Sequence, residues 1–247
     1  MRVWRSVRDE VRARAPGAYG QARNALWVSR WYVRRLRGGS LGPARDPYDA
    51  AFWDQNEQGD WDGFARLVLD LFRPRSVLDV GCGSGALLRA IGRAAPVVRR
   101  LGLEHSPEAL RRARSHGVEA RPFDAMALDG SSARRLRHEL GDWDLVTCFE
   151  VAEHLPPWRA RPFVRFLAQW DTLVFSAARP GQGGVWHLNE QHPRYWLKRF
   201  AACGMANDSK GGTLRQGLAP LNLGPWYAAN TLVLSRRPLA PVSRATE

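Results

Sequence analysis

Short apolar runs alternate with amphipathic segments from about residue 60 to residue 203. Brief runs rich in Val and Leu are typical of buried strands, whereas apolar residues at i, i+3, i+4 and i+7 are typical of helices. Phe64, Leu67, Val68 and Leu71 follow the helical spacing, and that segment ends before Pro74. The pattern predicts strands at 75–80, 97–104, 117–122, 143–149 and 171–177, and helices at 60–72, 84–93, 106–115, 131–140, 157–169 and 193–203.

This alternation of strands and helices predicts βαβ units. Such units build an α/β fold with a parallel sheet that helices cover on both faces. Ser106 followed by Pro107 is a typical helix start, with Ser as the cap and Pro in the first turn. The last third is less regular: a long polar loop at 178–193 precedes the helix at 193–203, and residues 226–236 predict a late strand.

The first 45 residues differ in charge from the rest of the chain. They hold eleven Arg and two acidic residues, so they supply nine of the net charge of +13. Residues 1–38 predict one or two helices broken near Pro16, and a Gly- and Pro-containing linker follows. We therefore divide the chain into a basic helical segment, 1–45, and a larger domain, 46–247.

The N-terminal segment allows three interpretations. Residues 24–36 mix Trp, Tyr, Val and Leu with Arg, and such a helix can lie on an anionic membrane surface. The arginines do not fall on one face, which favours packing over a binding cleft as a lid. A flexible basic arm is the third interpretation.

A glycine-rich turn joins the first predicted strand to its helix. Asp79 is followed by glycine at positions 81, 83 and 85. Glycine permits a tight turn and the close approach of a ligand, so a strand, glycine turn and helix are typical of nucleotide-type sites. The spacing also fits the fingerprint of NAD or FAD, and the surrounding residues must therefore decide the cofactor.

Acidic residues at the ends of three strands favour S-adenosylmethionine (SAM) over a dinucleotide. The Asp79 carboxylate is placed to bind the amino group of a methionine moiety, and it would repel a pyrophosphate. Glu104 is placed to accept hydrogen bonds from both hydroxyls of a ribose, which SAM and NAD share. Asp124 is placed to accept from an adenine amino group, with Phe123 near the ring. The alternative is that the glycines only form a tight turn.

Together these motifs resemble those of the class I SAM-dependent methyltransferases, over roughly residues 60–237. The matching pieces are Asp79-x-Gly81-x-Gly83-x-Gly85, the strand-end acids, and Asp142-x-Asp144 before the fourth strand. The resemblance implies a Rossmann-like, doubly wound, mostly parallel seven-stranded sheet with a late antiparallel strand, and SAM as cofactor. The residues expected to line the cofactor are Asp79, Gly81, Cys82, Gly83, Gly85, Glu104, His105, Phe123, Asp124 and Phe149.

Two polar segments follow the fourth and fifth strands. If Glu150 starts a helical turn, then Glu150, Glu153 and His154 fall at i, i+3 and i+4 on one side of it. Such a face could hold a divalent cation or a general base supported by acids. The later loop, 178–192, contains His187 and His192. Since ligands bind outside the carboxyl ends of the strands, both segments are expected near the substrate.

The Glu-x-x-Glu-His element resembles that of ubiquinone-pathway O-methyltransferases and of RNA 3′-end 2′-O-methyltransferases. In both groups it binds a divalent cation that holds the acceptor hydroxyls, and the RNA enzymes add a later His. The resemblance implies a metal set of Glu150, Glu153, His154 and His187, for Mg²⁺ or another divalent cation, with His192 as the weaker substitute for His187. The alternatives are catalysis without metal by His154 or His187 as base beside Glu153, and polar residues that only shape the pocket.

The predicted function is methylation of a hydroxyl. The loop at 182–191 with Tyr195 and Trp196 looks like that of bacterial methyltransferases of glycan and natural-product biosynthesis, which implies a glycan or small-metabolite acceptor. A nucleic-acid methyltransferase, which the basic segment favours, and a non-catalytic SAM-binding partner protein remain the alternatives.

Cysteine usage and hydropathy restrict the cellular setting. Cys82, Cys148 and Cys203 fit no zinc-binding spacing, and an odd number disfavours a disulfide framework. No apolar run reaches the length of a membrane span, and the N-terminus lacks the features of a secretory signal. The sequence therefore predicts a cytoplasmic protein, with contact to the inner membrane face through the N-terminal helix as an open alternative.

Overall fold

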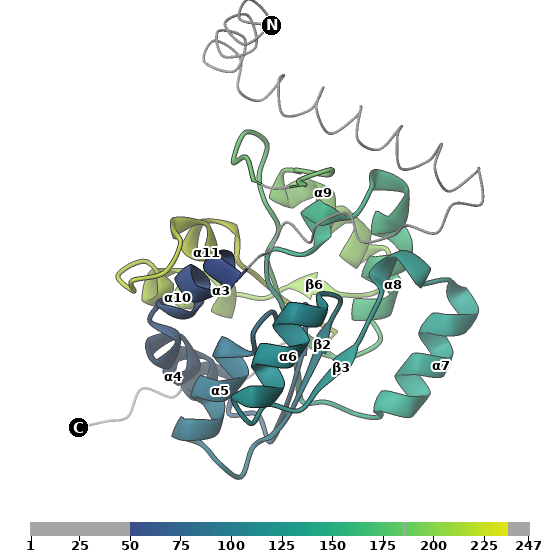
Figure 1. Cartoon of the computed structure of the whole chain (residues 1–247). Coiled ribbons are helices and arrows are strands. Elements are labelled where there is room, and N and C mark those ends of the chain that lie inside the picture. Colours follow the sequence, from purple (N-terminus) through teal and green to yellow (C-terminus); the bar gives the residue numbers. More distant parts are fainter. Residues whose placement is uncertain (1–49, 185, 237–247) are drawn as a thin grey trace, which may run out of the picture.

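The computed structural model describes residues 50–184 and 186–236 (Figure 1). The basic segment at 1–45, its proposed lid or membrane-contacting helix, and the boundary after residue 45 lie outside the described residues. The cofactor and metal candidates named above all lie within them.

A single seven-stranded sheet forms the centre of the described part, in the order β3-β2-β1-β4-β5-β7-β6. The five strands from β1 to β5 run parallel, and β7 pairs antiparallel with both β5 and β6. The predicted α/β fold, doubly wound with a late antiparallel strand, is confirmed. The strands are β1 (Ser76–Val80), β2 (Arg99–Glu104), β3 (Ala120–Pro122), β4 (Leu145–Cys148), β5 (Thr172–Phe175), β6 (Ala206–Asn207) and β7 (Leu232–Ser235).

Helices cover both faces of the sheet, as parallel strands buried on two sides require (Figure 1). One core contains residues of α4 (Trp61–Phe72), α5 (Ala86–Ala94), α6 (Pro107–Ser115) and α10 (Lys210–Leu218). The core on the other face contains residues of α7 (Gly130–Leu140), α8 (Ala160–Leu167) and α9 (Pro193–Ala201). Because both sheet faces are filled by side chains, a ligand site must lie at an edge of the sheet.

Side-chain caps fix where several helices begin. The Ser106 hydroxyl accepts a hydrogen bond from the amide of Ala109, 3.3 Å away, and Pro107 occupies the first turn of α6 as predicted. Asp60 caps α4 through the amide of Gly63 at 2.8 Å. Each cap satisfies an amide that the helix itself leaves unpaired. The start of α6 matters for the site, because it directly follows Glu104 and β2.

The last third of the chain differs most from the sequence-based expectation. The segment predicted as one strand at 226–236 begins instead as helix α11 (Pro225–Asn230), and only Leu232–Ser235 forms β7. Pro225 in the first helical turn and the packing of Tyr227 against Trp61, at 5.6 Å between ring centroids, favour the helix. Three further elements were not predicted: α3 (Ala50–Glu57), β6 and α10.

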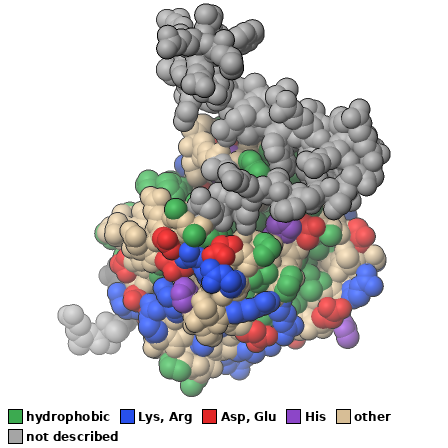
Figure 2. Space-filling model, in the orientation of Figure 1, with side chains coloured by type: hydrophobic (Ala, Val, Ile, Leu, Met, Phe, Trp, Pro, Cys, Tyr) green, Lys and Arg blue, Asp and Glu red, His purple; other side chains and the backbone are tan. Residues whose placement is uncertain are grey.

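The described surface mixes charges of both signs. Figure 2 shows acidic and basic side chains interspersed over the face that carries α6. No helix within 50–184 or 186–236 combines the length and apolar character that crossing a membrane requires. Cys82, Cys148 and Cys203 are free thiols, and the first two are buried.

Candidate functional site

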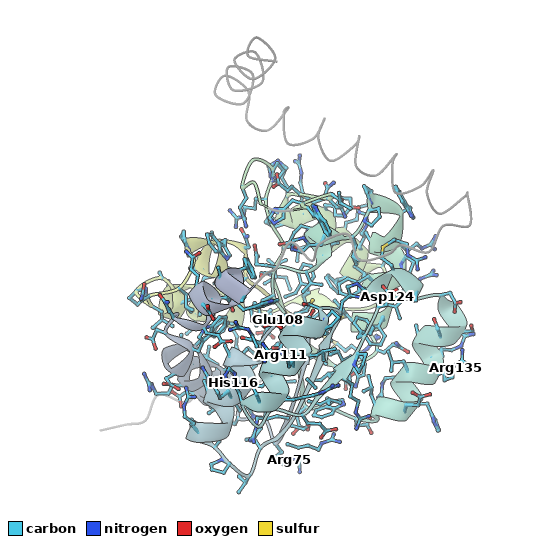
Figure 3. The ribbon with its side chains drawn as sticks, viewed as in Figure 1. Arg75, Glu108, Arg111, His116, Asp124 and Arg135 are labelled. Atoms are coloured by element: carbon cyan, nitrogen blue, oxygen red, sulfur yellow. The ribbon has the colours of Figure 1, made fainter. Side chains whose placement is uncertain are left out.

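The carboxyl ends of the parallel strands gather the candidate residues at one edge of the sheet. Figure 3 shows Arg75, which precedes β1, and Asp124, which follows β3, at opposite ends of the strands. Asp79 lies near the end of β1 and Glu104 ends β2, and these two strands are neighbours. The edge that contains Asp124 is therefore the one at which the predicted cofactor residues meet.

Asp79 is a buried carboxyl, 5% exposed. It is paired in register with Thr147 of β4, whose hydroxyl donates to its Oδ1 at 2.7 Å. Burial raises the pKa of Asp79 to about 7; the Thr147 hydrogen bond partly offsets that rise, and the Glu104 carboxylate adds to it. A buried carboxyl that ionises near neutral pH is typical of a group that meets a cationic ligand.

The glycine turn is held by bonds within the chain. The amides of Gly81 and Cys82 both donate to the carbonyl of Leu103, at 2.7 and 3.1 Å, and the amide of Gly83 donates to Glu104 Oε2 at 2.8 Å. These three amides are therefore satisfied within the chain and do not form a cradle for phosphate, while the close approach of a ligand to the turn stays a prediction. Positive φ angles at Gly81 and Gly83 explain why glycine is required there.

The Glu104 carboxylate accepts hydrogen bonds from amides of the glycine turn and of the segment that follows β2. Besides Gly83, it accepts hydrogen bonds through Oε1 from the amides of His105 and Ser106, at 2.7 and 2.8 Å. Burial raises the pKa of Glu104, and these amides oppose the rise. A carboxylate has about four acceptor positions. Glu104 thus already accepts from three amides, and its bonds to the ribose hydroxyls stay a prediction.

The residues predicted to contact adenine are divided between the core and the surface. Phe123 is a core residue, 9% exposed, that stacks on Phe166 with 5.3 Å between ring centroids. Asp124 is exposed, and its Oδ1 accepts from the amide of Met126 at 2.8 Å. His105 is exposed beside Glu104. Phe149 is half-buried and packs against Phe64 at 5.0 Å.

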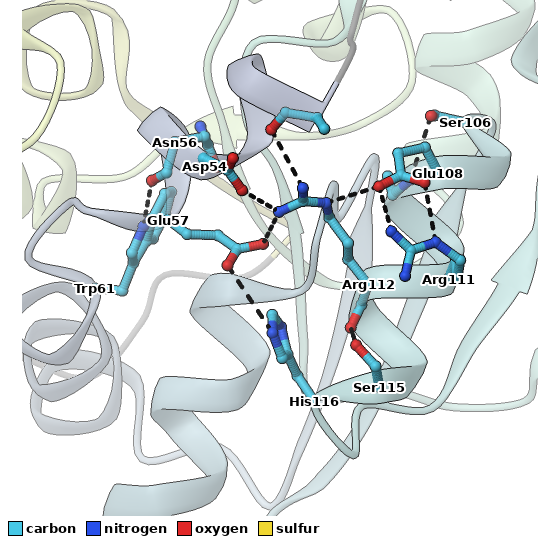
Figure 4. Close-up of polar contacts among 12 residues, drawn as sticks. Asp54, Asn56, Glu57, Trp61, Ser106, Glu108, Arg111, Arg112, Ser115 and His116 are labelled. Carbon is cyan, nitrogen blue, oxygen red and sulfur yellow. Dashed lines mark hydrogen bonds and ion pairs between the residues drawn. The ribbon is translucent and has the colours of Figure 1, made fainter.

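Helix α3 covers the glycine turn. A Cβ placed on Gly83 would lie 2.6 Å from the ring of Trp53, so the indole rests directly on the turn. Arg112 of α6 holds this helix: its guanidinium binds Asp54 at 2.8 Å, Glu57 at 3.4 Å and the carbonyl of Ala50 at 3.2 Å (Figure 4). Helix α3 thus packs over the glycine turn, where the predicted cofactor residues meet, and the sequence-based analysis did not predict this helix.

Replacing Arg112 by Met should destabilise the packing of α3 on the rest of the protein. We expect amide exchange in α3 to accelerate roughly tenfold, because the local opening of a helix is limited by its tertiary contacts. Hydrogen exchange followed by mass spectrometry would measure this. The matched control is Arg111→Met, since among the described residues Arg111 pairs with Glu108 of its own helix and not with α3. Equal exchange in both variants would contradict a specific role for Arg112.

Glu150 is not part of the predicted helical face. Its φ of 53° is left-handed, and the 3₁₀ turn (Ala152–His154) begins after it. Its carboxylate accepts from Gln182 Nε2 at 2.8 Å and from Asn230 Nδ2 at 3.1 Å. The expected i, i+3, i+4 arrangement is therefore wrong, because the chain reverses at the end of β4 before it turns helically. The donor group that lies together consists of Glu153, His154 and His187, without Glu150.

Glu153 is fully buried, and among the described residues no hydrogen bond of ordinary geometry reaches either carboxylate oxygen, although the Glu150 carboxyl and the backbone of Glu153 and Ala178 lie near enough to affect its pKa. Burial raises the pKa of Glu153 well above its usual range, and the nearby Glu150 carboxylate raises it further. A buried carboxyl without a partner is costly to the folded state. Such a group is typical of a site that binds a ligand from outside the chain.

His154 and His187 flank this carboxyl. One ligand atom from each of Glu153, His154 and His187 lies within 4.8 Å of the other two, and the imidazole centroids are 4.9 Å apart. His154 Nδ1 lies 3.3 Å from the carbonyl of Trp186, and His187 Nδ1 lies 3.0 Å from Glu190 Oε1. Each Nδ1 atom thus lies beside an oxygen that can accept its proton.

The loop after β5 assembles this group. The carbonyl of Glu153 accepts from the amides of Leu188 and Asn189, at 2.7 and 2.9 Å, so the loop docks on the 3₁₀ turn. His192 is exposed at the start of α9 and lies outside the donor group. Gln182, Glu190 and Asn230 were not predicted. The polar density of the loop at 178–192 pointed to the first two, whereas no local pattern marks Asn230.

A family model described as a methyltransferase domain matches residues 78–173. The match begins in β1 and ends in β5, so it contains the glycine turn, Glu104, Glu153 and His154. Residues 78–173 of the chain are therefore similar to a methyltransferase domain. His187 and Glu190 lie beyond the matched residues, in the loop that follows β5.

Curated relatives match parts of the chain. A ubiquinone biosynthesis O-methyltransferase from Ralstonia nicotianae is 39% identical over 85 residues, which cover 33% of this chain and 33% of that protein. A protein of the same name from Cupriavidus pinatubonensis is 32% identical over 142 residues, 48% of this chain and 53% of that protein. The chain thus spans about half the length, or less, of these curated relatives.

Solved structures share the fold. CalS10, a SAM-bound amino pentose methyltransferase from Micromonospora echinaspora, has a TM-score of 0.52 at 19% identity, over 80% of this chain and all of that chain. DesVI of Streptomyces venezuelae has a TM-score of 0.54 at 16% identity, again over 80% of this chain and all of that chain. At these identities the likeness establishes the architecture only.

Proposed function

We propose that this protein is a SAM-dependent methyltransferase that methylates a hydroxyl of a glycan or small metabolite with the help of a divalent cation. The observation that carries the proposal is the buried Glu153 carboxyl, which has no hydrogen bond of ordinary geometry within residues 50–184 and 186–236. It lies beside His154 and His187, at the carboxyl ends of the strands, where Asp79 also lies. The cofactor and the acceptor oxygen would therefore bind at neighbouring positions along the same carboxyl ends of the strands.

The cofactor half of the proposal rests on Asp79 and the glycine turn. A carboxyl that titrates near neutral pH suits the ammonium of a methionine moiety. The turn's amides are bonded within the chain, so a pyrophosphate would meet the Asp79 carboxylate without amide donors to compensate. Both features favour SAM over a dinucleotide. Trp53 and helix α3 would close over the bound cofactor.

The metal half rests on Glu153, His154 and His187. Their ligand atoms are close enough to converge on one ion, and each imidazole has the Nδ1 partner that metal-bound histidines usually have. Two nitrogen donors with one carboxylate suit Mn²⁺, Fe²⁺ or Zn²⁺ better than Mg²⁺, which prefers oxygen. When bound, such an ion would lower the pKa of an acceptor hydroxyl.

The chain's own residues would then act mainly by positioning. Methyl transfer from a sulfonium is an in-line displacement, so alignment of the acceptor oxygen with the methyl group supplies much of the rate. The docked loop, tied to Glu153 through Leu188 and Asn189, would hold His187 in place and restrict water. Without a metal, His154 or His187 would instead accept the hydroxyl proton beside Glu153.

The acceptor class is inferred from the relatives and the site. The curated relatives carry O-methyltransferase names, and one structural neighbour is named for an amino pentose substrate. Both kinds of acceptor are small molecules. A nucleic-acid acceptor is the second candidate, because residues 1–45 carry a surplus of nine positive charges.

The decisive experiment is transfer of labelled methyl from SAM into a fractionated host lysate, with and without EDTA. We expect label in the glycan or small-molecule fraction, and we expect EDTA to abolish it. Label that EDTA leaves unchanged would contradict the metal and leave a histidine base. Label in nucleic acid would favour the second candidate, and absence of label in every fraction of a lysate known to contain both acceptor classes would favour a non-catalytic binder.

A further inference from the structure

We propose that Glu190 is a positioning residue that fixes the tautomer and orientation of His187. The same carboxylate holds residues 181–183 of the loop after β5 in place through their amides. The inference rests on the proposed function, because it assigns the working nitrogen of His187. It concerns a residue outside the sequence-based candidate set and outside the family match at 78–173.

One carboxylate accepts three hydrogen bonds here. Glu190 Oε1 accepts from the amide of Gly183 at 2.8 Å and lies 3.0 Å from His187 Nδ1, while Oε2 accepts from the amide of Gly181 at 2.8 Å. The His187 and Glu190 side chains are only 10% and 17% exposed, so water competes weakly for these bonds. Glu190 is therefore the common anchor of the loop and of the imidazole.

The carboxylate selects one form of the imidazole. A neutral imidazole in water favours a proton on Nε2, and a carboxylate beside Nδ1 reverses that preference, because only a protonated Nδ1 can donate to it. The reversal leaves the Nε2 lone pair for a metal ion or for the proton of an acceptor hydroxyl. Without Glu190, His187 would present the wrong nitrogen atom for either role.

A second observation supports the same orientation. A Cβ placed on Gly184 would collide with His187 Nε2, so Gly184 packs against the Nε2 edge of the imidazole and only glycine fits there with the ring in this orientation. Gly184 also follows the two residues that Glu190 ties down. The loop thus shapes the space on the Nε2 side while Glu190 occupies the Nδ1 side.

The test is nitrogen NMR of the full chain with ¹⁵N-labelled histidine, at about pH 8.5, where an unperturbed imidazole is neutral. The His187 signals are assigned by comparison with His187→Asn. We expect the wild-type protein to carry the proton on Nδ1, and Glu190→Ala to carry it on Nε2. The matched control is Glu139→Ala, an exposed acid on α7, which should leave the tautomer unchanged.

A wild-type His187 protonated on Nε2 would overturn the proposal, and this reading does not depend on whether the variant folds. An unchanged tautomer in Glu190→Ala would overturn it as well. Mn²⁺ binding, followed by electron paramagnetic resonance, is the second readout, and loss of an outer-sphere partner should weaken it by about 10- to 100-fold. Absence of Mn²⁺ binding to the wild-type protein would contradict the metal in the proposed function, while the NMR result would still decide the role of Glu190.

Discussion

Asp79→Asn is expected to weaken binding of S-adenosylhomocysteine by about 100-fold at pH 8, because it removes a charged hydrogen bond worth roughly 1.5–3 kcal/mol. The substitution keeps the size of the side chain, and its amide oxygen can still accept from Thr147. Isothermal titration calorimetry would measure the change. Asp70→Asn is the matched control, since Asp70 is exposed on α4, away from this edge.

The same carboxyl should make cofactor binding depend on pH. The pKa of Asp79 is raised to about 7 in the folded protein, so the carboxylate that would meet the cofactor ammonium forms only as the pH rises through that value. Affinity of the wild-type protein should fall by about tenfold for each pH unit below 7 and level off above it. In Asp79→Asn this dependence should disappear, and a persistent slope in that variant would refute the assignment.

Stability without cofactor should follow the opposite trend. Because the folded pKa of Asp79 lies above the unfolded value of 3.8, the folded state binds the proton more tightly. Its contribution is therefore greatest below about pH 4 and is lost as the pH rises toward 7, by up to about 4 kcal/mol. Asp79→Asn should be more stable than the wild-type protein at pH 8. Urea unfolding at several pH values would check the sign.

Glu153→Leu is expected to lower the rate of methyl transfer by at least about 1000-fold while raising the stability of the protein. The rate falls because the variant removes the only acidic ligand of the proposed ion, and a misplaced acceptor loses most of the benefit of alignment. Stability rises by roughly 1–3 kcal/mol, since a buried carboxyl that has no hydrogen bond of ordinary geometry among the described residues is replaced by an apolar side chain of similar size.

Opposite effects on activity and stability would distinguish a functional from a structural Glu153. Thermal unfolding of the metal-free protein, run beside the labelled-methyl assay, gives both readouts. The control is Glu139→Leu, in which an exposed acid on α7 is changed in the same way. A strongly destabilised Glu153→Leu would mean that the carboxyl supports the fold, and an unchanged rate would remove it from the site.

The central α/β core follows from local sequence pattern. The strands β1, β2, β4 and β5 are short runs of apolar residues whose burial on both faces leaves few alternatives. The glycine turn is equally local, because positive φ angles at Gly81, Gly83 and Gly85 demand the residue that the sequence supplies. The caps at Ser106 and Asp60 belong to the same class of short-range signal.

The sequence-based predictions were wrong at positions where tertiary contacts override the local pattern. Residues 226–230 combine Trp, Tyr and Ala in a way that fits a strand or a helix, and the packing of Tyr227 against Trp61 and Phe64 decides for the helix. Glu150 was expected on a helical face, but its left-handed backbone and its bonds to Gln182 and Asn230 turn it elsewhere. Each partner lies at least 32 residues away along the chain.

By itself, then, the sequence determined the parallel sheet, the glycine turn, and the types of residue available for chemistry at its carboxyl edge. Those features depend on periodicity and on backbone conformation within a few residues. The tertiary structure alone decided that Trp53 covers Gly83, that the Glu153 carboxyl is buried beside two imidazoles, and that Glu190 holds one of them. Such contacts join segments that approach only when the chain folds, and their energies depend on burial, which no local pattern records.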